Sequence, residues 1–198
     1  MTEIFHSRKV RDSMARNRNF KYVPDIVISD ARITGRPNFS GVERTNPNTG
    51  RVVNSAGNRN FCVDIPAEGV MANDGSNKWL TVDELVELGW PIKAHASFGD
   101  EEEPPSYYLP IKVGYKFRPP TVYLVAGNKR HDIGEKEIDT FDGRQFNKVD
   151  LIVHPSVRQD WDTGDTAITA YLAEGWFYMS MSPFAQAWED EHMNEDAE

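Results

Sequence analysis

Apolar and polar side chains alternate clearly from Tyr107 to Lys116. A period of two residues is typical of a β-strand with one buried face. The apolar side of this predicted strand carries Tyr107, Leu109, Ile111, Val113 and Tyr115. The segment Arg59–Ile65 alternates in the same way and predicts a second half-buried strand. The core side of that second strand carries Phe61, Val63 and Ile65.

Further strands are predicted where β-branched and aromatic residues are concentrated. These segments are Val23–Thr34, Trp90–His95, Thr121–Ala126, Val149–Val153 and Thr166–Met179. The intervening segment Gly35–Asn60 is rich in Gly, Asn and Pro, which predicts a long loop or an irregular hairpin.

A single short helix is predicted after Thr81. Thr81 and Glu84 have the spacing of a capping box, in which the hydroxyl and the carboxylate each accept a backbone N–H of the first turn. Gly89 is placed to end this helix after about two turns. Short strands, one helix and the absence of strand–helix–strand spacing predict a mainly β fold, and specifically a single OB-like antiparallel β-barrel.

Charge divides the chain into three parts. The net charge is −9, but residues 1–60 carry +6 and residues 61–198 carry −15. We expect a flexible basic N-terminal arm or weakly formed helix in residues 1–22, an OB-like domain in residues 23–182, and an acidic C-terminal tail in residues 183–198. An acidic protein of this kind can still present a basic face, because the local field and not the total charge attracts a polyanion.

Several classes of protein are excluded by what the sequence lacks. No stretch of eighteen apolar residues is present, so we expect no membrane span, and the N-terminus has no apolar signal segment. The lone Cys62 permits no internal disulfide and fits a reducing cytoplasm. These features predict a soluble intracellular protein without a membrane partner.

Signatures of catalysis are also missing. Neither glycine-rich phosphate loop, no nucleophile elbow and no zinc-protease motif occurs, and the five histidines are scattered. The alternating acids of Asp160–Asp165 lack the glycine and glutamate of an EF-hand loop, so a polar turn is favoured. We therefore expect no enzyme activity, no cofactor and no metal. The alternative is a nucleic-acid-processing enzyme with a carboxylate metal site built from residues such as Asp139, Asp142 and Asp150.

The polar side of the strand at residues 107–116 is the main candidate for binding. Single strands are held by cations along the phosphate backbone and by aromatic rings on which bases stack. Aromatic and cationic side chains are interleaved on this strand and on adjoining loops, as in an OB-fold groove. The residues predicted to contact phosphates are Arg36, Arg44, Arg59, Lys112, Lys116 and Arg118. Those predicted to stack on bases are Phe39, Tyr108 and Phe117.

Core packing is the competing interpretation for the aromatic residues. It is favoured for Phe61, Tyr107 and Tyr115, and Tyr123 on the next predicted strand is assigned to the core or to the polar face. For Phe39, Tyr108 and Phe117 the two interpretations are balanced. The acidic tail has three competing roles: a competitor for the basic groove, a recruiter of partner proteins, or a solubilising terminus.

Several motifs in a fixed order resemble the bacteriophage single-stranded-DNA-binding proteins with an OB-type barrel. The most specific pair is Asn38-Phe-Ser-Gly41 followed by Gly57-Asn-Arg-Asn-Phe61. Weaker ones are Glu87–Lys93, Tyr108–Tyr115, Arg118–Leu124, Val149–Pro155 and Ala170–Leu172. Together they span about residues 23–180, while the basic arm, residues 43–55 and residues 72–78 depart from the pattern.

This resemblance implies a protein that coats exposed single-stranded DNA during phage DNA replication or recombination, in the cytoplasm of an infected bacterium. The expected partners are single-stranded DNA and, through the acidic tail, replication or recombination proteins; a homo-oligomer is left open. Besides the enzyme, the remaining alternative is a phage interaction or structural module that uses the barrel as a scaffold without binding DNA.

Overall fold

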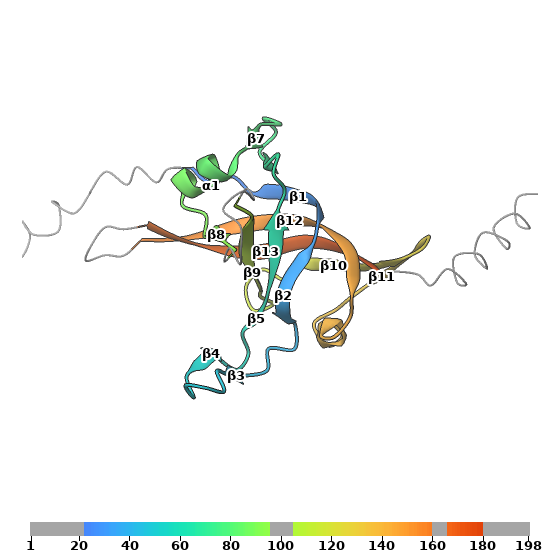
Figure 1. The fold of residues 1–198 in the computed structure, drawn as a ribbon. Helices are drawn as coiled ribbons and strands as arrows, with labels where there is room; N and C mark the ends of the chain where they lie inside the picture. The colour runs from blue at the N-terminus through green and yellow to red at the C-terminus, as the bar shows by residue number, and fades with distance from the viewer. Residues whose placement is uncertain (1–21, 96–104, 160–165, 180–198) are drawn as a thin grey trace, which may run out of the picture.

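A computed structural model describes residues 22–95, 105–159 and 166–179 (Figure 1). The predicted basic arm, apart from Tyr22, the acidic tail and the polar turn Asp160–Asp165 lie outside the described residues. The strands are β1 (Ile26–Ala31), β2 (Ile33–Asn38), β3 (Arg44–Thr45), β4 (Val52–Asn54), β5 (Arg59–Ile65), β6 (Val70–Ala72), β7 (Trp79–Leu80), β8 (Lys93–Ala94), β9 (Tyr107–Val113), β10 (Thr121–Ala126), β11 (Lys129–Asp132), β12 (Phe146–Gln159) and β13 (Thr166–Met179). The helices are α1 (Val82–Leu88) and the 3₁₀ turn η2 (Ile138–Phe141).

The prediction of a mainly β fold with one short α-helix is confirmed for the described residues. One sheet of eleven strands runs in the order β2-β5-β9-β13-β12-β1-β6-β7, with β8, β10 and β11 attached beside this path. Two details differ from an antiparallel closed barrel. β13 pairs in parallel with both β9 and β10, and the hydrogen-bonded path through the described strands does not close on itself.

The predicted strand Val23–Thr34 is two strands. β1 pairs with β12 and β6, whereas β2 pairs with β5 on another part of the sheet. The left-handed φ of 55° at Asp30 belongs to a β-bulge near the end of β1, between Ile28 and Ala31, and the Asp30 backbone N–H donates to the Asp150 carboxylate. A positive φ is tolerated best by Gly, Asn and Asp, so Asp30 suits the bulge.

The core is built from the apolar sides of the alternating strands. Phe61, Val63, Leu109, Ile111 and Val113 are all buried, as their spacing predicts. Four phenylalanine rings of this core form a cluster, in which Phe39 and Phe177 each contact the other three rings. These rings belong to Phe39, Phe61, Phe141 and Phe177.

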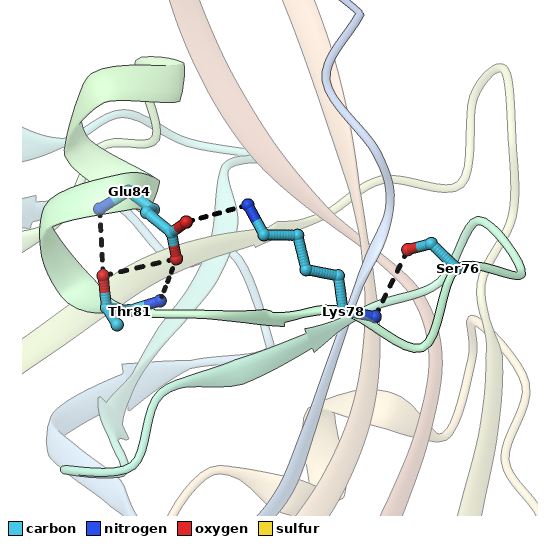
Figure 2. A network of polar contacts seen from close by, with 4 residues as sticks. All are labelled: Ser76, Lys78, Thr81 and Glu84. Carbon is cyan, nitrogen blue, oxygen red and sulfur yellow. Dashed lines mark hydrogen bonds and ion pairs between the residues drawn. The ribbon is translucent and has the colours of Figure 1, made fainter.

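The helix α1 begins at the predicted capping box. The Glu84 N–H donates to the Thr81 hydroxyl at 3.3 Å, and the Thr81 N–H donates to the Glu84 carboxylate at 2.9 Å (Figure 2). Lys78 donates to the other oxygen of Glu84 at 2.8 Å. Gly89 ends the helix with a left-handed φ of 93°, as its position in the sequence predicts.

Two hairpins extend from the sheet. β12 and β13 form a ribbon of fourteen-residue strands that runs across the molecule (Figure 1). β10 and β11 lie beside the end of this ribbon where β13 ends. β3 and β4 form a separate two-stranded hairpin that projects from β2 and β5. The segment Gly35–Asn60 is therefore partly strand and partly the predicted irregular hairpin.

Candidate nucleic-acid interface

A row of polar side chains crosses the outer face of four neighbouring strands. Asn60 of β5 is opposite Lys112 of β9, Lys112 is opposite Tyr171 of β13, and Tyr171 is opposite His154 of β12. Their strand neighbours Phe61, Ile111, Leu172 and Val153 are buried, so the row faces outward. The period of two that builds the core thus also builds this polar row on the other side of the sheet.

The loop after β9 turns this row into a groove of about 560 Å³. Gly114 begins the loop, and a Cβ at this position would lie 3.3 Å from the Tyr171 ring, so the missing side chain makes room for that ring. The groove is lined by Gly57, Asn58, Arg59, Lys112, Val113, Gly114, Lys116, Phe117, Arg118, His154, Ser156, Arg158, Tyr171 and Leu172. Five of these residues are cationic and none is acidic.

Five of the nine predicted site residues line this one groove. They are Arg59, Lys112, Lys116, Phe117 and Arg118. The sequence interpretation missed Arg158, His154 and Tyr171. Tyr171 lies in the predicted strand Thr166–Met179, but His154 and Arg158 lie beyond the predicted strand Val149–Val153. The pairing of β12 with β13 brings all three into the groove with Lys112.

Phe117 is the most exposed aromatic residue of the groove. Its side chain is 89% exposed, and the Lys116 ammonium lies 5.3 Å from the ring centroid. An exposed phenyl ring buries no apolar area against the protein, so it contributes little to folding. A ring with a cation beside it can stack on a base while the cation meets the adjoining phosphate.

Arg118 is held by a chain of hydrogen bonds. Its Nη1 donates to His154 Nε2 at 3.1 Å, and His154 Nδ1 is 2.7 Å from the Asp25 carboxylate. A guanidinium can only donate, so His154 accepts at Nε2 and donates from Nδ1 to Asp25. This chain fixes the Arg118 guanidinium at the groove wall.

Arg59 sits at the other end of the groove. It forms an ion pair with Glu135 at 3.0 Å and lies 5.4 Å from the centroid of the Tyr115 ring. The Nε of Arg59 and the hydroxyl of Tyr115 are buried without a hydrogen-bond partner among the described residues. Burial also raises the pKa of Tyr115.

Arg36 and Arg44 lie in a separate hollow of about 740 Å³. The Arg44 guanidinium donates to the backbone oxygens of Arg36 and Pro37, at 3.0 and 2.6 Å, and so holds the base of the β3–β4 hairpin. Arg144, Asp142 and Glu43 line the same hollow, which therefore carries both signs of charge. The structure does not bring Arg36 and Arg44 together with the groove.

Tyr108 is on the outer face of β9, as predicted, but does not line the groove. Its ring lies 4.8 Å from the His95 ring, and His95 is 2.9 Å from the Asp64 carboxylate. These neighbours come from β5 and from the residue after β8, so Tyr108 belongs to a second cluster on the same face.

The prediction that Phe39 stacks on bases is wrong. Its side chain is fully buried, with the Phe61 ring stacked at 5.1 Å and the Phe141 and Phe177 rings packed edge-on. Phe39 follows the last residue of β2, where the chain bends inward, so its ring enters the core rather than the polar face.

The Asn-Phe-Ser-Gly and Gly-Asn-Arg-Asn-Phe motifs, which include Phe39, are joined by hydrogen bonds. The buried Asn38 amide donates to the backbone oxygens of Val42 and Asn58. The Gly57 N–H donates to the Gly41 oxygen at 2.8 Å, which closes the base of the β3–β4 hairpin. These hydrogen bonds fix the turn at Gly57 and Asn58, and this turn positions Arg59, the next residue of the second motif.

Two of the three carboxylates of the enzyme alternative, Asp142 and Asp150, accept hydrogen bonds from the backbone. Asp142 accepts the backbone N–H groups of Phe39 and Ser40, and Asp150 accepts that of Asp30. In the part of the chain that the structure describes, no three His, Cys, Asp or Glu side chains form a group that could hold a metal ion. Within the same residues, no helix has the length and apolar character needed to cross a membrane.

A mainly β fold with an exposed aromatic ring in a cationic groove has features in common with nucleic-acid-binding β folds. The family model described as "Putative phage ssDNA-binding domain" matches residues 16–196, and the chain belongs to this family. The resemblance of its motifs to phage single-stranded-DNA-binding proteins is thereby confirmed.

Two solved structures are similar to the chain. One is a single-stranded DNA-binding protein from bacteriophage Enc34 in complex with single-stranded DNA, with 16% identity and a TM-score of 0.45, covering 81% of this chain and 89% of that one. The other is a C-terminal truncation of the Enc34 protein, with 16% identity and a TM-score of 0.44, covering 81% and 88%. No curated protein matches the chain.

Proposed function

We propose that this chain is a non-enzymatic protein that binds single-stranded DNA with little sequence preference and coats it during phage DNA replication or recombination. The observation that carries the proposal is the groove, whose lining holds five cations, of which Arg59 is paired with Glu135, together with the exposed Phe117 and no acidic residue. Membership in the phage single-stranded-DNA-binding domain family supports the same function.

Phosphates would meet Arg59, Lys112, Lys116, Arg118 and Arg158 along the groove. A base would stack on Phe117, for a contribution of about 1–3 kcal/mol. Since cations and ring faces distinguish bases poorly, this set of contacts gives affinity without sequence readout. Arg36, Arg44 and Tyr108 would contact DNA outside this groove.

The proposed setting is the cytoplasm of the infected bacterium. Residues 23–182 would form the DNA-binding domain, residues 1–22 a basic arm and residues 183–198 an acidic tail that recruits replication or recombination proteins. The tail holds six acids from Phe184 onward and neither Lys nor Arg, which suits a contact with a basic partner surface.

Fluorescence anisotropy on a labelled oligo-dT strand and on its duplex tests the function directly. We expect tighter binding to the single strand, and an affinity that falls with added salt as counterions compete. Lys116→Glu should weaken binding at least tenfold, because one cation of the groove becomes an anion beside Phe117. The matched control is Lys136→Glu, which reverses an exposed lysine outside the groove lining. Absence of binding at low salt, or equal binding to duplex, would contradict the proposed function.

A further inference from the structure

A second group of aromatic and cationic side chains lies outside the groove lining. The Tyr123 ring of β10 and the Trp176 ring of β13 are stacked, with centroids 5.3 Å apart and an angle of 28° between their planes. The Arg130 guanidinium of β11 lies 4.6 Å from the Tyr123 centroid. One row further along β13, the Lys148 ammonium lies 5.0 Å from the Tyr178 ring. We call Tyr123, Arg130, Lys148, Trp176 and Tyr178 the outer platform.

Strand register fixes the platform on the outer face of the sheet. Tyr123 is directly opposite Trp176 in the parallel β10–β13 pair, and Lys148 is opposite Tyr178 in the antiparallel β12–β13 pair. The neighbours of Trp176 on its own strand, Gly175 and Phe177, are buried. Both stacked rings are half-buried, so each keeps part of its surface in solvent.

The platform and the groove share one ribbon. Tyr171, which lines the groove, and Trp176 are both on the outer face of β13, and five residues of strand separate them by about 15 Å. The loop that carries Phe117 and Arg118 leads after two prolines into β10, the strand that holds Tyr123. A strand leaving the groove along β13 would therefore meet the platform next.

The chemistry of the platform favours bases over phosphates. Lys148 is paired with Asp30 at 3.1 Å, and the pKa of Lys148 is raised by that carboxylate. Burial and the nearby Asp150 carboxylate raise the pKa of Tyr178, and Glu174 lies between the platform and Tyr171 on β13. These acids repel phosphate, whereas the stacked rings offer apolar faces at a fixed orientation.

We propose that the outer platform is a second base-stacking subsite, which takes the part of a single DNA strand that extends beyond the groove. This inference rests on the proposed function and adds to it the length of strand that one protein molecule contacts. Preorganised rings lower the ordering cost of stacking, so the subsite adds affinity without adding many phosphate contacts.

Oligonucleotide length separates the two subsites. OB folds bind about 4–16 nucleotides of single strand. We therefore expect a strand of about 5 nucleotides to occupy the groove alone and a strand of about 16 nucleotides to reach the platform as well. Trp176→Ala should weaken binding of the long strand about tenfold, in line with the loss of one stacked base, and leave the short strand unchanged. Arg118→Ala should weaken both. The matched control is Trp79→Ala, which removes an exposed tryptophan of β7 and should change neither.

Salt dependence provides a second criterion. Trp176→Ala should leave the slope of log affinity against log salt unchanged, because stacking releases no counterions. Equal long-strand affinity for Trp176→Ala and the unaltered protein would overturn the platform while the proposed function stands. Failure of the unaltered protein to bind either strand would instead overturn the proposed function.

Tryptophan fluorescence covers the case in which Trp176→Ala unfolds. In Trp176→Phe the stacking ring is kept but its fluorescence is removed, so long-strand affinity should be retained. The quenching that the long strand causes in the unaltered protein should decrease in this variant, and the quenching by the short strand should stay the same. Identical quenching of both proteins by the long strand would overturn the inference.

Discussion

Phe39 and Phe117 are both phenylalanines beside polar residues, yet one is fully buried and the other is 89% exposed. Neither position belongs to an alternating segment, so the local sequence carries no signal for the direction of the side chain. The difference comes from tertiary structure, since Phe141 and Phe177 supply the pocket for Phe39. No such rings lie against Phe117 among the described residues, where its one ring contact is with the Lys116 ammonium.

Alanine substitution should separate the roles of these two rings. Phe39→Ala leaves a cavity in the core and should lower the free energy of unfolding by about 3–5 kcal/mol. Phe117→Ala should change it by less than about 0.5 kcal/mol, as for an exposed surface residue. The same Phe117→Ala variant should lose about 1–3 kcal/mol of binding to oligo-dT. Urea unfolding and anisotropy measure both effects, and a large stability loss in Phe117→Ala would contradict its assignment to the groove surface.

Substitution of His154 tests whether the Asp25–His154–Arg118 chain positions the guanidinium. In His154→Gln the side-chain oxygen can accept from Arg118 while the amide donates to Asp25, so affinity for single-stranded DNA should be nearly retained. His154→Ala removes both hydrogen bonds and should cost about 1 kcal/mol of binding. The affinities of the two variants for oligo-dT are compared by anisotropy, after urea unfolding has shown that their unfolding midpoints are equal. Equal losses of affinity in the two variants would contradict a positioning role for the Asp25–His154–Arg118 hydrogen bonds.

Elements with their own local signal were predicted from the sequence. β5, β10 and β13 have the predicted bounds, and α1 begins at its capping box. β12 is longer than the predicted Val149–Val153, because its outer half is defined by pairing with β13 rather than by alternation. The break between β1 and β2 was missed for a similar reason: the two halves take different partners, and only Arg32 lies between them.

The capping box should contribute measurably to stability. Thr81→Ala removes the acceptor of the Glu84 N–H and should cost about 1 kcal/mol of unfolding free energy. Thermal or urea unfolding measures the loss. The control is Thr121→Ala, an exposed threonine of β10 away from the cap. A loss no greater than that of the control would contradict a stabilising cap.

The pH dependence of the same network has a definite sign. Hydrogen bonding by Lys78 and by the Thr81 N–H lowers the pKa of Glu84. A carboxyl whose pKa is lower in the folded state stabilises the fold above its ordinary pKa, and this contribution is lost as pH falls through the lowered value. Glu84→Gln should therefore be less stable than the unaltered protein near neutral pH, and the two should converge in acid. A stability difference that stays constant from neutral pH into acid would contradict this linkage.

At the scale of the whole molecule, charge segregation is the feature that the sequence reveals best. The chain has a net charge of −9, but the groove gathers five cations and no acid among its lining. Four of those cations were predicted because they lie in or beside alternating strands. Arg158 was not, and Arg36 and Arg44 were wrongly grouped with the others, because pairing between distant strands decides which cations share a surface.

The slope of log affinity against log salt tests the central claim most directly. Each phosphate neutralised on a single strand contributes about 0.7 to this slope, so Arg118→Ala/Arg158→Ala should lower it by about 1.4 relative to the unaltered protein. Arg32→Ala/Lys136→Ala removes the same charge at two exposed residues outside both hollows and should leave the slope unchanged. An unchanged slope in the groove variant, or an equal decrease in both variants, would contradict a strand path through this groove.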